Sequence, residues 1–223
     1  MAEEFPSFSI KDCALISLAT GKRAQNLREL RERIQTIDAE SIYYHFWGVL
    51  LRPSFEDPEF KNDFASWCRH SIHDDKTAEM LSIIDPTEFA TLDELRAEII
   101  EVIEERLDET EFVRWASPDD QFNFKTFQTV VFDTGNRIEK PADLPEAIEK
   151  MSISSIFYHF IDARRRTPNR MDDFRQWLMG CGSQFDEVCR EVGLVDPFFP
   201  TLHELRGQLA KLFREHLPPG VGR

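Results

Sequence analysis

The chain has 223 residues, of which 41% are hydrophobic and 30% charged, and its formal net charge at pH 7 is −14. This composition, with 19 Phe, supplies enough apolar material for a packed core and excludes a disordered chain. The negative charge argues against nucleic acid or an anionic membrane surface as a partner, because both attract clustered Lys and Arg.

The apolar runs CALISLA and FWGVLL are far shorter than the ~20 residues that span a bilayer. The acidic start, MAEEFPSFS, lacks the basic and apolar segments of a signal peptide, so we expect a cytoplasmic protein. The four cysteines are Cys13, Cys68, Cys181 and Cys189, and they form no paired motif. We therefore expect no zinc site, no disulfide framework and no cofactor.

The first predicted element is a strand, because β-branched and aromatic residues run from Phe8 to a Thr-Gly pair at Thr20 and Gly21. Gly21 would allow the positive φ that turns the chain towards a helix. We expect that helix to begin at Asn26, because Glu29 follows three residues later in the pattern of a capping box.

An aromatic helix is predicted next, at about 40–51, and contains the stretch SIYYHFW. A further segment carries the pattern Asp-Phe-x-x-Trp from Asp63, and a short one ends at an Asp-Pro pair, where helix is disfavoured. The last helix of this half is expected to begin at Thr91, with Glu94 as the third residue of its first turn and a single apolar stripe.

The same order of elements then recurs along the chain. A shift of 114 residues aligns the strand from Phe8 with a strand from Phe122, and it aligns SIYYHF with SIFYHF. A shift of 110 residues aligns DFASWC, from Asp63, with DFRQWL, from Asp173. We interpret the pattern as a tandem duplication. Its parts are a first repeat at 8–107, a linker at 108–121, a second repeat at 122–217 and a flexible tail at 218–223.

The second repeat is expected to have a helix at Asp143 with Glu146, an aromatic helix at about 153–165 and a last helix from Thr201. A single strand in each repeat would leave its ladder groups unpaired. We therefore expect the two strands to pair across a pseudo-twofold axis. The predicted fold class is α+β and predominantly helical, with two tandem repeats, each of one strand followed by about five helical segments.

His45 and its equivalent His159 lie in helices that are apolar nearly all round, so both are expected in the interior. A buried imidazole needs hydrogen-bond partners. One interpretation is structural, with the ring bonded to a carboxylate or carbonyl of a neighbouring helix. The other is a general base or ligand contact. Retention in both halves fits a fold requirement or two equivalent sites, and we favour the structural interpretation.

Two clusters have a functional and a simpler interpretation. The stretch WCRHSIHDD offers His70 and His73 as metal ligands, but no third ligand is identifiable, so we expect an exposed helix end. The turns at Thr20 and Thr134 place Arg23 and Arg137 where they could hold an anion, although pairing of each arginine with a local acid is favoured. A site in which His45 joins His70 and His73 ranks lowest.

A third cluster comprises Arg164, Arg165, Arg166 and Arg170. It could dock an acidic partner. We favour a solvated or self-paired face, since cations near a helix C-terminus complement the helix dipole.

The segments SIYYHFW, NDFASW and IDPTEFATLDELRAEIIEVIEERL resemble a bacterial and archaeal family known only as a domain of unknown function. Its members similarly combine a Phe-x-Phe strand, an NLREL helix, a Tyr-His helix and an NDFA block followed by Trp. The matching positions are Phe8, Ile10, Thr20, Gly21, Ala24, Asn26 to Leu30, Tyr44, His45, Asn62 to Ala65 and Trp67. Ile10 departs from the pattern, and the second repeat matches less well. The resemblance implies no activity, cofactor or catalytic residue.

No common catalytic or nucleotide-binding signature occurs in the sequence. We therefore predict a non-catalytic binding or regulatory module, a monomer or a dimer, with another protein as partner. The alternative is an enzyme, or a binder of a sugar or phosphate metabolite, with a pocket near His45 or His159. The candidate ligand-binding residues are His45, Tyr44, Arg23 and Trp67, with the equivalent His159, Tyr158, Arg137 and Trp177. No residue is predicted to be catalytic or to bind a metal.

Overall fold

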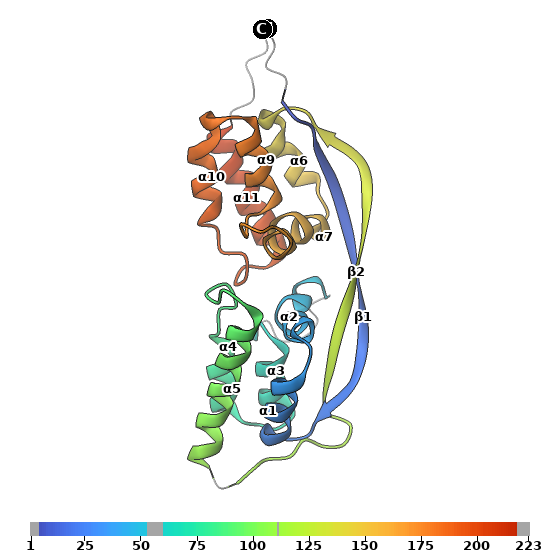
Figure 1. Cartoon of the computed structure of the whole chain (residues 1–223), viewed down its shortest axis with the longest axis vertical. Helices are drawn as coiled ribbons and strands as arrows, with labels where there is room; N and C mark the ends of the chain where they lie inside the picture. The colour runs from blue at the N-terminus through green and yellow to red at the C-terminus, as the bar shows by residue number, and fades with distance from the viewer. Residues whose placement is uncertain (1–4, 53–59, 111, 218–223) are drawn as a thin grey trace. The chain divides into compact units, whose positions relative to one another are not determined.

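The computed structural model describes residues 5–52, 60–110 and 112–217 (Figure 1). Two long strands, β1 (Phe8–Ala24) and β2 (Phe122–Ile138), pair with each other as an antiparallel ribbon, and most of the remaining chain is helical. The predicted fold class, α+β with helix predominant, is confirmed. The tandem duplication, its boundaries and its pseudo-twofold axis stay predictions, and the predicted tail at 218–223 lies outside the described residues.

The helices follow each strand in chain order. After β1 come α1 (Leu27–Thr36), α2 (Ala39–Trp47), the 3-10 turn η1 (Gly48–Leu51), α3 (Asp63–His70), α4 (Asp75–Ser82) and α5 (Leu92–Glu109). After β2 come η2 (Pro141–Asp143), α6 (Leu144–Lys150), α7 (Ile153–Ile156), the π-helical turn η3 (Phe157–Asp162), α8 (Ala163–Arg166), α9 (Asp173–Cys181), η4 (Ser183–Phe185), α10 (Asp186–Gly193) and α11 (Leu202–His216). Among the described helices, none is both long and apolar enough to cross a bilayer. The cytoplasmic location stays a prediction.

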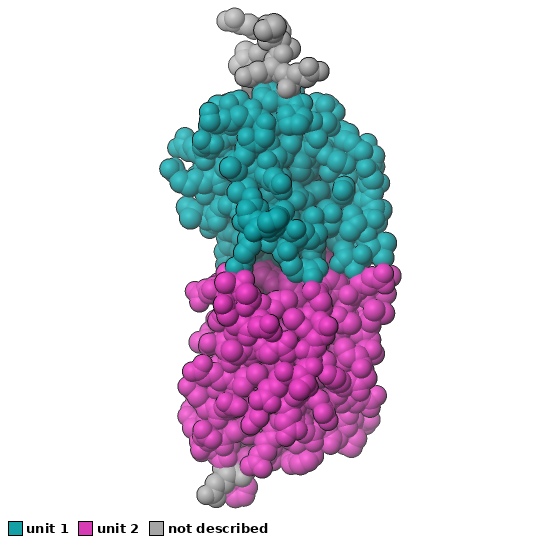
Figure 2. Space-filling view, in the orientation of Figure 1, with its two compact units in different colours: residues 1–14, 129–223 teal, residues 15–128 magenta. Residues whose placement is uncertain are grey.

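Each strand is divided between two compact units (Figure 2). One unit comprises Leu15–Gln128, and the other combines Met1–Ala14 with Thr129–Arg223. The beginning of β2 therefore covers the helices that follow β1, and the beginning of β1 covers the helices that follow β2. The compact units thus divide the chain differently from the two stretches of matching sequence.

Aromatic side chains attach each strand beginning to its helices. In the unit 15–128, Phe122 stacks on Phe64 of α3 at a ring-centroid distance of 5.1 Å, and Phe122 and Phe124 are both buried. In the other unit, Phe8 lies 5.5 Å from the ring of Phe174 in α9. Burial of a Phe side chain contributes about 1.5–3 kcal/mol relative to exposure, so these contacts are a major part of each core.

The helix starts are determined by side-chain caps. The predicted cap at Asn26 is confirmed, because its side chain accepts the backbone N–H of Glu29, and Thr91 forms a complete capping box with its helix. The predicted helix start at Asp143 is confirmed, since α6 begins directly after it, but the capping box is not formed: Asp143 ends a 3-10 turn with helical φ and ψ and makes no cap hydrogen bond. Pro145 follows at the second helical position and has no N–H to offer to a cap.

Gly21 has the predicted positive φ, +75°, but the chain does not leave the strand there. β1 continues to Ala24, and the equivalent Gly135, with φ of +78°, lies inside β2. The two Thr-Gly pairs are therefore irregularities within the ribbon rather than turns into helices.

Candidate functional site

His45 lies on α2 and is only 2% exposed. Its Nδ1 is 2.7 Å from the Oδ2 of Asp63 in α3, and its Nε2 accepts the backbone N–H of Lys125 in β2 at 3.0 Å. Because Nε2 accepts a hydrogen bond, the ring proton is on Nδ1 and is donated to Asp63. Ser41, one turn earlier, donates its hydroxyl to the carbonyl of Lys125 at 2.7 Å. Helix α2 thus holds both backbone groups of one strand residue.

Burial favours the neutral imidazole. It lowers the pKa of His45 below the ordinary 6.5, although the hydrogen bond and the charge of Asp63 act in the opposite direction. For Asp63, burial alone would raise the pKa, but hydrogen bonds from His45 and Arg52 outweigh it and hold the pKa below 3.8. The pair is therefore a neutral ring that donates to an ionised carboxylate.

Arg52 completes this network. Its Nη1 and Nη2 donate to the two carboxylate oxygens of Asp63 at 3.0 and 2.8 Å, and its guanidinium lies 4.9 Å from the ring centroid of Tyr44. The Tyr44 hydroxyl lies 3.0 Å from the Ser17 hydroxyl on β1. Bidentate pairing fixes the carboxylate in the plane that His45 requires.

The unit that combines Met1–Ala14 with Thr129–Arg223 repeats the arrangement around His159. Its Nδ1 lies 2.7 Å from the Oδ2 of Asp173 in α9, and its Nε2 accepts the backbone N–H of Lys11 in β1 at 2.9 Å. Ser155 donates its hydroxyl to the carbonyl of Lys11 at 2.6 Å. The two histidines therefore make the same hydrogen bonds, each to the strand that does not directly precede its helix.

The predicted tryptophans also bond to the chain near a strand. Trp67 donates its indole N–H to the carbonyl of Asp120, just before β2, at 2.7 Å. Trp177 donates to the carbonyl of Pro6, just before β1, at 2.6 Å. Both indole N–H groups are thus occupied within the protein, and both rings are buried.

Arg166 is bound more tightly than Arg52. Its Nε donates to Asp162 at 2.8 Å, and its Nη2 donates to the carbonyl of Tyr158 at 2.9 Å and to Asp173 at 3.2 Å. Its guanidinium also lies 4.0 Å from the ring centroid of Tyr158. Arg166 is therefore surrounded by acceptors of its own unit.

A cavity of about 500 Å³ opens beside His45, and we call it the Arg52 cavity. Its size is typical of sites for small ligands. Its lining comes from α2, η1, α3, β2 and the residues that flank them: His45, Arg52, Asp63, Ser66, Trp67, His70, Ser71, Gln121, Phe122, Asn123 and Lys125. It brings His45 and Trp67 together and adds polar residues that were not predicted.

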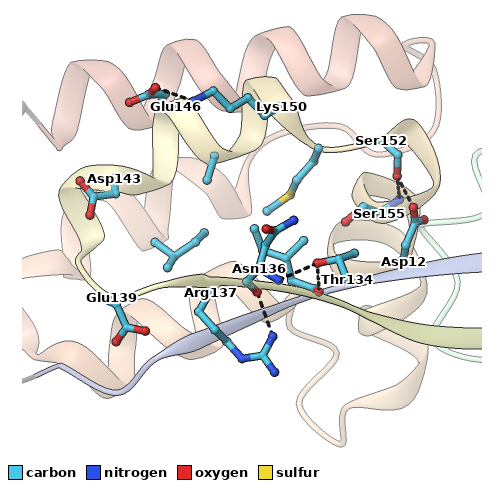
Figure 3. Close-up of a pocket in the computed structure, with 14 residues that line it drawn as sticks. Asp12, Thr134, Asn136, Arg137, Glu139, Asp143, Glu146, Lys150, Ser152 and Ser155 are labelled. Carbon is cyan, nitrogen blue, oxygen red and sulfur yellow. Dashed lines mark hydrogen bonds and ion pairs between the residues drawn. The ribbon is translucent and has the colours of Figure 1, made fainter.

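A second cavity, of about 580 Å³, lies between α6 and the end of β2 and is called the α6 cavity (Figure 3). Its lining includes Arg137, whose guanidinium extends away from α6 and forms two 2.8 Å bonds with Asp133. Lys150 pairs with Glu146 at 2.6 Å. The α6 cavity is therefore acidic in character, and Arg137 is bound to a local acid.

Residues Arg23, His70 and His73 of the other predicted clusters are exposed on the surface. Arg23 is exposed on β1 and lines neither of the two cavities. His70 ends α3 and His73 follows it, both exposed. No group of three His, Cys, Asp or Glu side chains in the described part of the chain is arranged to hold a metal ion.

The arginine cluster contacts the chain's own carboxylates. Arg165 and Arg166 pair with Asp162 at 3.3 and 2.8 Å, and Arg164 lies 4.0 Å from Asp172. These ion pairs agree with the self-paired interpretation rather than with a free basic surface.

Residues 5–214 match the model of a family of unknown function (DUF5752). The chain belongs to this family. The resemblance found in the sequence is thereby confirmed. The structure is similar to that of OrfY from Thermoproteus tenax, with a TM-score of 0.81 and 28% sequence identity, over 96% of this chain and 97% of OrfY. No curated protein matches the sequence.

Arg52, Asp63 and Lys125 belong to the site although none of them was predicted as a site residue. A signal was present, since Arg52 and Lys125 each have an identical residue 114 positions away, and Asp63 has one 110 positions away. Comparing the two halves position by position for charged residues would have identified all three.

Proposed function

We propose that this is a non-catalytic binding protein, which recognises its partner or ligand without transforming it. The hydrogen bonds of the two histidines carry this proposal. A general base needs a free lone pair within reach of its substrate. The Nε2 lone pairs of His45 and His159 accept strand N–H groups, and their Nδ1 protons are donated to carboxylates.

Both imidazoles therefore serve the fold, because each joins two helices to a strand. A histidine that left this arrangement to take up a proton would leave a strand N–H without its partner, at a cost of about 1–3 kcal/mol, and would remove one of the hydrogen bonds of the carboxylate. The net charge of −14 supports a partner other than nucleic acid or an anionic membrane. A protein partner remains our preferred proposal for macromolecular binding.

A second candidate function is the binding of a sugar or phosphate metabolite near His45. The Arg52 cavity favours it, because it is of ligand size and is lined by hydroxyl, amide and cationic groups beside an indole. Of the residues predicted for such a site, His45 and Trp67 would lie at the ligand, and Tyr44 would position Arg52. We propose no equivalent site at His159, Tyr158, Trp177 or Arg137.

The experiment is a thermal-shift screen of the full chain against nucleotides, sugar phosphates and divalent metals, followed by NMR of every compound that stabilises it. A ligand at 100 times its Kd adds about 2.7 kcal/mol, which raises the Tm of a protein of this size by several degrees. We expect such compounds to be returned unchanged after prolonged incubation. Conversion of one of them, lost in a folded His45→Gln variant, would contradict the non-catalytic proposal.

A further inference from the structure

The charge inside the Arg52 cavity differs from that of the whole molecule. Two cations, Arg52 and Lys125, line it against a single carboxylate, that of Asp63, although the chain carries a net charge of −14. Asp63 already accepts hydrogen bonds from both Arg52 and His45. The cavity therefore has positive charge in excess of what its own carboxylate neutralises.

Lys125 supplies that excess. Its backbone is fixed by His45 and Ser41, while its side chain is exposed at the cavity. Within the described residues its ammonium forms neither an ion pair nor a hydrogen bond. An ammonium held by its backbone beside a guanidinium is a suitable point charge for an anionic oxygen.

Neutral polar groups surround the two cations. Ser66, Ser71 and Asn123 line the same cavity, and Asn123 donates its amide N–H to the carbonyl of Gln121 at 2.9 Å. Trp67 contributes an apolar wall, since its indole N–H is bound to the backbone. This combination of cations, hydroxyls and one aromatic wall fits a small polar molecule with an anionic group.

The matching place in the other unit also has an exposed lysine, Lys11, but it adds a carboxylate beside its arginine. Shifting Arg52 by 114 residues gives Arg166, and the same shift of Gly48 gives Asp162. Asp162 accepts a 2.8 Å bond from Arg166, whereas Gly48 offers no side chain to Arg52. Arg166 is therefore neutralised by an acid that has no equivalent beside Arg52.

We propose that the Arg52 cavity binds a small anionic molecule, whose phosphate or carboxylate oxygens contact Arg52 and Lys125, and that the equivalent place at Arg166 does not. This inference rests on the proposed binding function and adds the class of ligand. The anion contacts the Arg52 guanidinium on the side that Asp63 leaves open, and the Lys125 ammonium is its second cationic partner.

The test is isothermal titration of the full chain at low ionic strength with two probes, inorganic pyrophosphate and citrate. The phosphate and carboxylate probes distinguish the two ligand sources. The decisive variant is Lys125→Met, and its matched control is Lys11→Met, at the equivalent strand position in the other unit. Both remove one ammonium from an exposed side chain, and both keep the backbone N–H that a histidine accepts.

We expect at least one probe to bind, Lys125→Met to weaken binding about tenfold or more, and Lys11→Met to leave the Kd unchanged, because a charge-assisted contact is lost only in the first. Equal Tm values for the variants and the parent chain verify the fold. Failure of both probes to bind, or equal weakening by both variants, would overturn the proposal. Hydrolysis of bound pyrophosphate to phosphate would contradict the non-catalytic function and leave the anion site standing.

Discussion

At the scale of single residues, His45 closes a series of hydrogen bonds that runs from the Arg52 guanidinium through Asp63 to the backbone of β2. Each member holds the next in place: the guanidinium orients the carboxylate, the carboxylate selects the ring tautomer, and the ring accepts the strand N–H. Such a buried network stabilises the fold only while every group keeps its partner.

The position of His45 predicts a pH-dependent stability. Its folded pKa lies below the 6.5 of the unfolded chain, so the unfolded state takes up a proton first as the pH falls. Stability is complete above about pH 6.5 and is lost as the pH falls from there towards the folded pKa, by at most about 1.4 kcal/mol per pH unit for one group. Urea unfolding between pH 7.5 and 5 measures it.

The control is the His45→Gln variant, which cannot take up the proton. We expect it to be less stable at pH 7.5 by about 2 kcal/mol, because the Lys125 N–H loses its acceptor and Asp63 loses one of its donors, and to show a flatter pH dependence down to pH 5. Identical slopes for the variant and the parent chain would show that other groups cause the dependence.

How far these residues could be predicted depends on the kind of contact. The apolar surroundings of His45 in the sequence indicated a buried ring bonded to a carboxylate or a carbonyl of a neighbouring helix, and the structure has the carboxylate of Asp63 in α3 at that place. The backbone N–H of Lys125 could not be predicted, because every residue except proline has such a group. The Arg52 cavity is equally invisible in the sequence, since it forms where an unpredicted contact brings α3 to β2.

At the scale of elements, the two strands show that contacts across the ribbon can outweigh a local turn signal. Thr-Gly pairs ordinarily indicate turns, yet both strands continue past theirs. The hydroxyl of Thr20 donates to the carbonyl of Phe124 at 2.8 Å, and that of Thr134 donates to the carbonyl of Ile10 at 2.7 Å. These bonds across the ribbon support the chain where glycine leaves the regular strand conformation.

The same substitution is therefore expected to have opposite effects at two glycines. Gly21→Ala should reduce the free energy of unfolding by about 1 kcal/mol or more, because a φ of +75° is costly for a residue with a Cβ. Gly207→Ala should increase it by about 0.5–1 kcal/mol, because Gly207 lies inside α11 and an added Cβ meets no atom within 4 Å.

Denaturant midpoints of the two variants check this pair of predictions. The space around Gly21 is also open, since nothing lies within 4 Å of an added Cβ, so the loss expected there has a conformational cause rather than a steric one. A Gly21→Asn variant, which tolerates positive φ better, should recover part of the loss. Equal effects of Ala and Asn would contradict the conformational cause.

At the scale of the whole molecule, the matching sequence stretches and the compact units divide the chain at different residues. The stretch 8–107 contains α1 to α4 and all but the last two residues of α5, but not Phe122, Phe124 or Lys125, which contact those helices. Pattern comparison can detect that two halves are alike. It cannot show which strand covers which helices. Both strands have the same alternation of apolar and polar residues, so either strand could bury its apolar side chains against either set of helices.

This difference leads to a prediction about fragments. A fragment of residues 15–128 contains every element of its compact unit, including the beginning of β2, and should unfold cooperatively in a thermal scan followed by circular dichroism. A fragment of residues 8–107 has the same helices, with α5 two residues shorter, but lacks Phe122 and Phe124. Losing one buried Phe side chain costs about 3–5 kcal/mol, and domains of this size have only about 5–15 kcal/mol in total.

We therefore expect 8–107 to show helical signal without a cooperative transition. Addition of the fragment 108–223 should restore a cooperative transition, because that fragment supplies Phe122 and Phe124. In return, 8–107 supplies Phe8 and Lys11 to the helices of 108–223. Mixing with 129–223, which lacks the beginning of β2, is the matched control and should restore nothing to the helices of 8–107. Cooperative unfolding of 8–107 alone at the Tm of 15–128 would mean that β1 can cover its own helices. In that case the exchange of strand beginnings would be dispensable for folding.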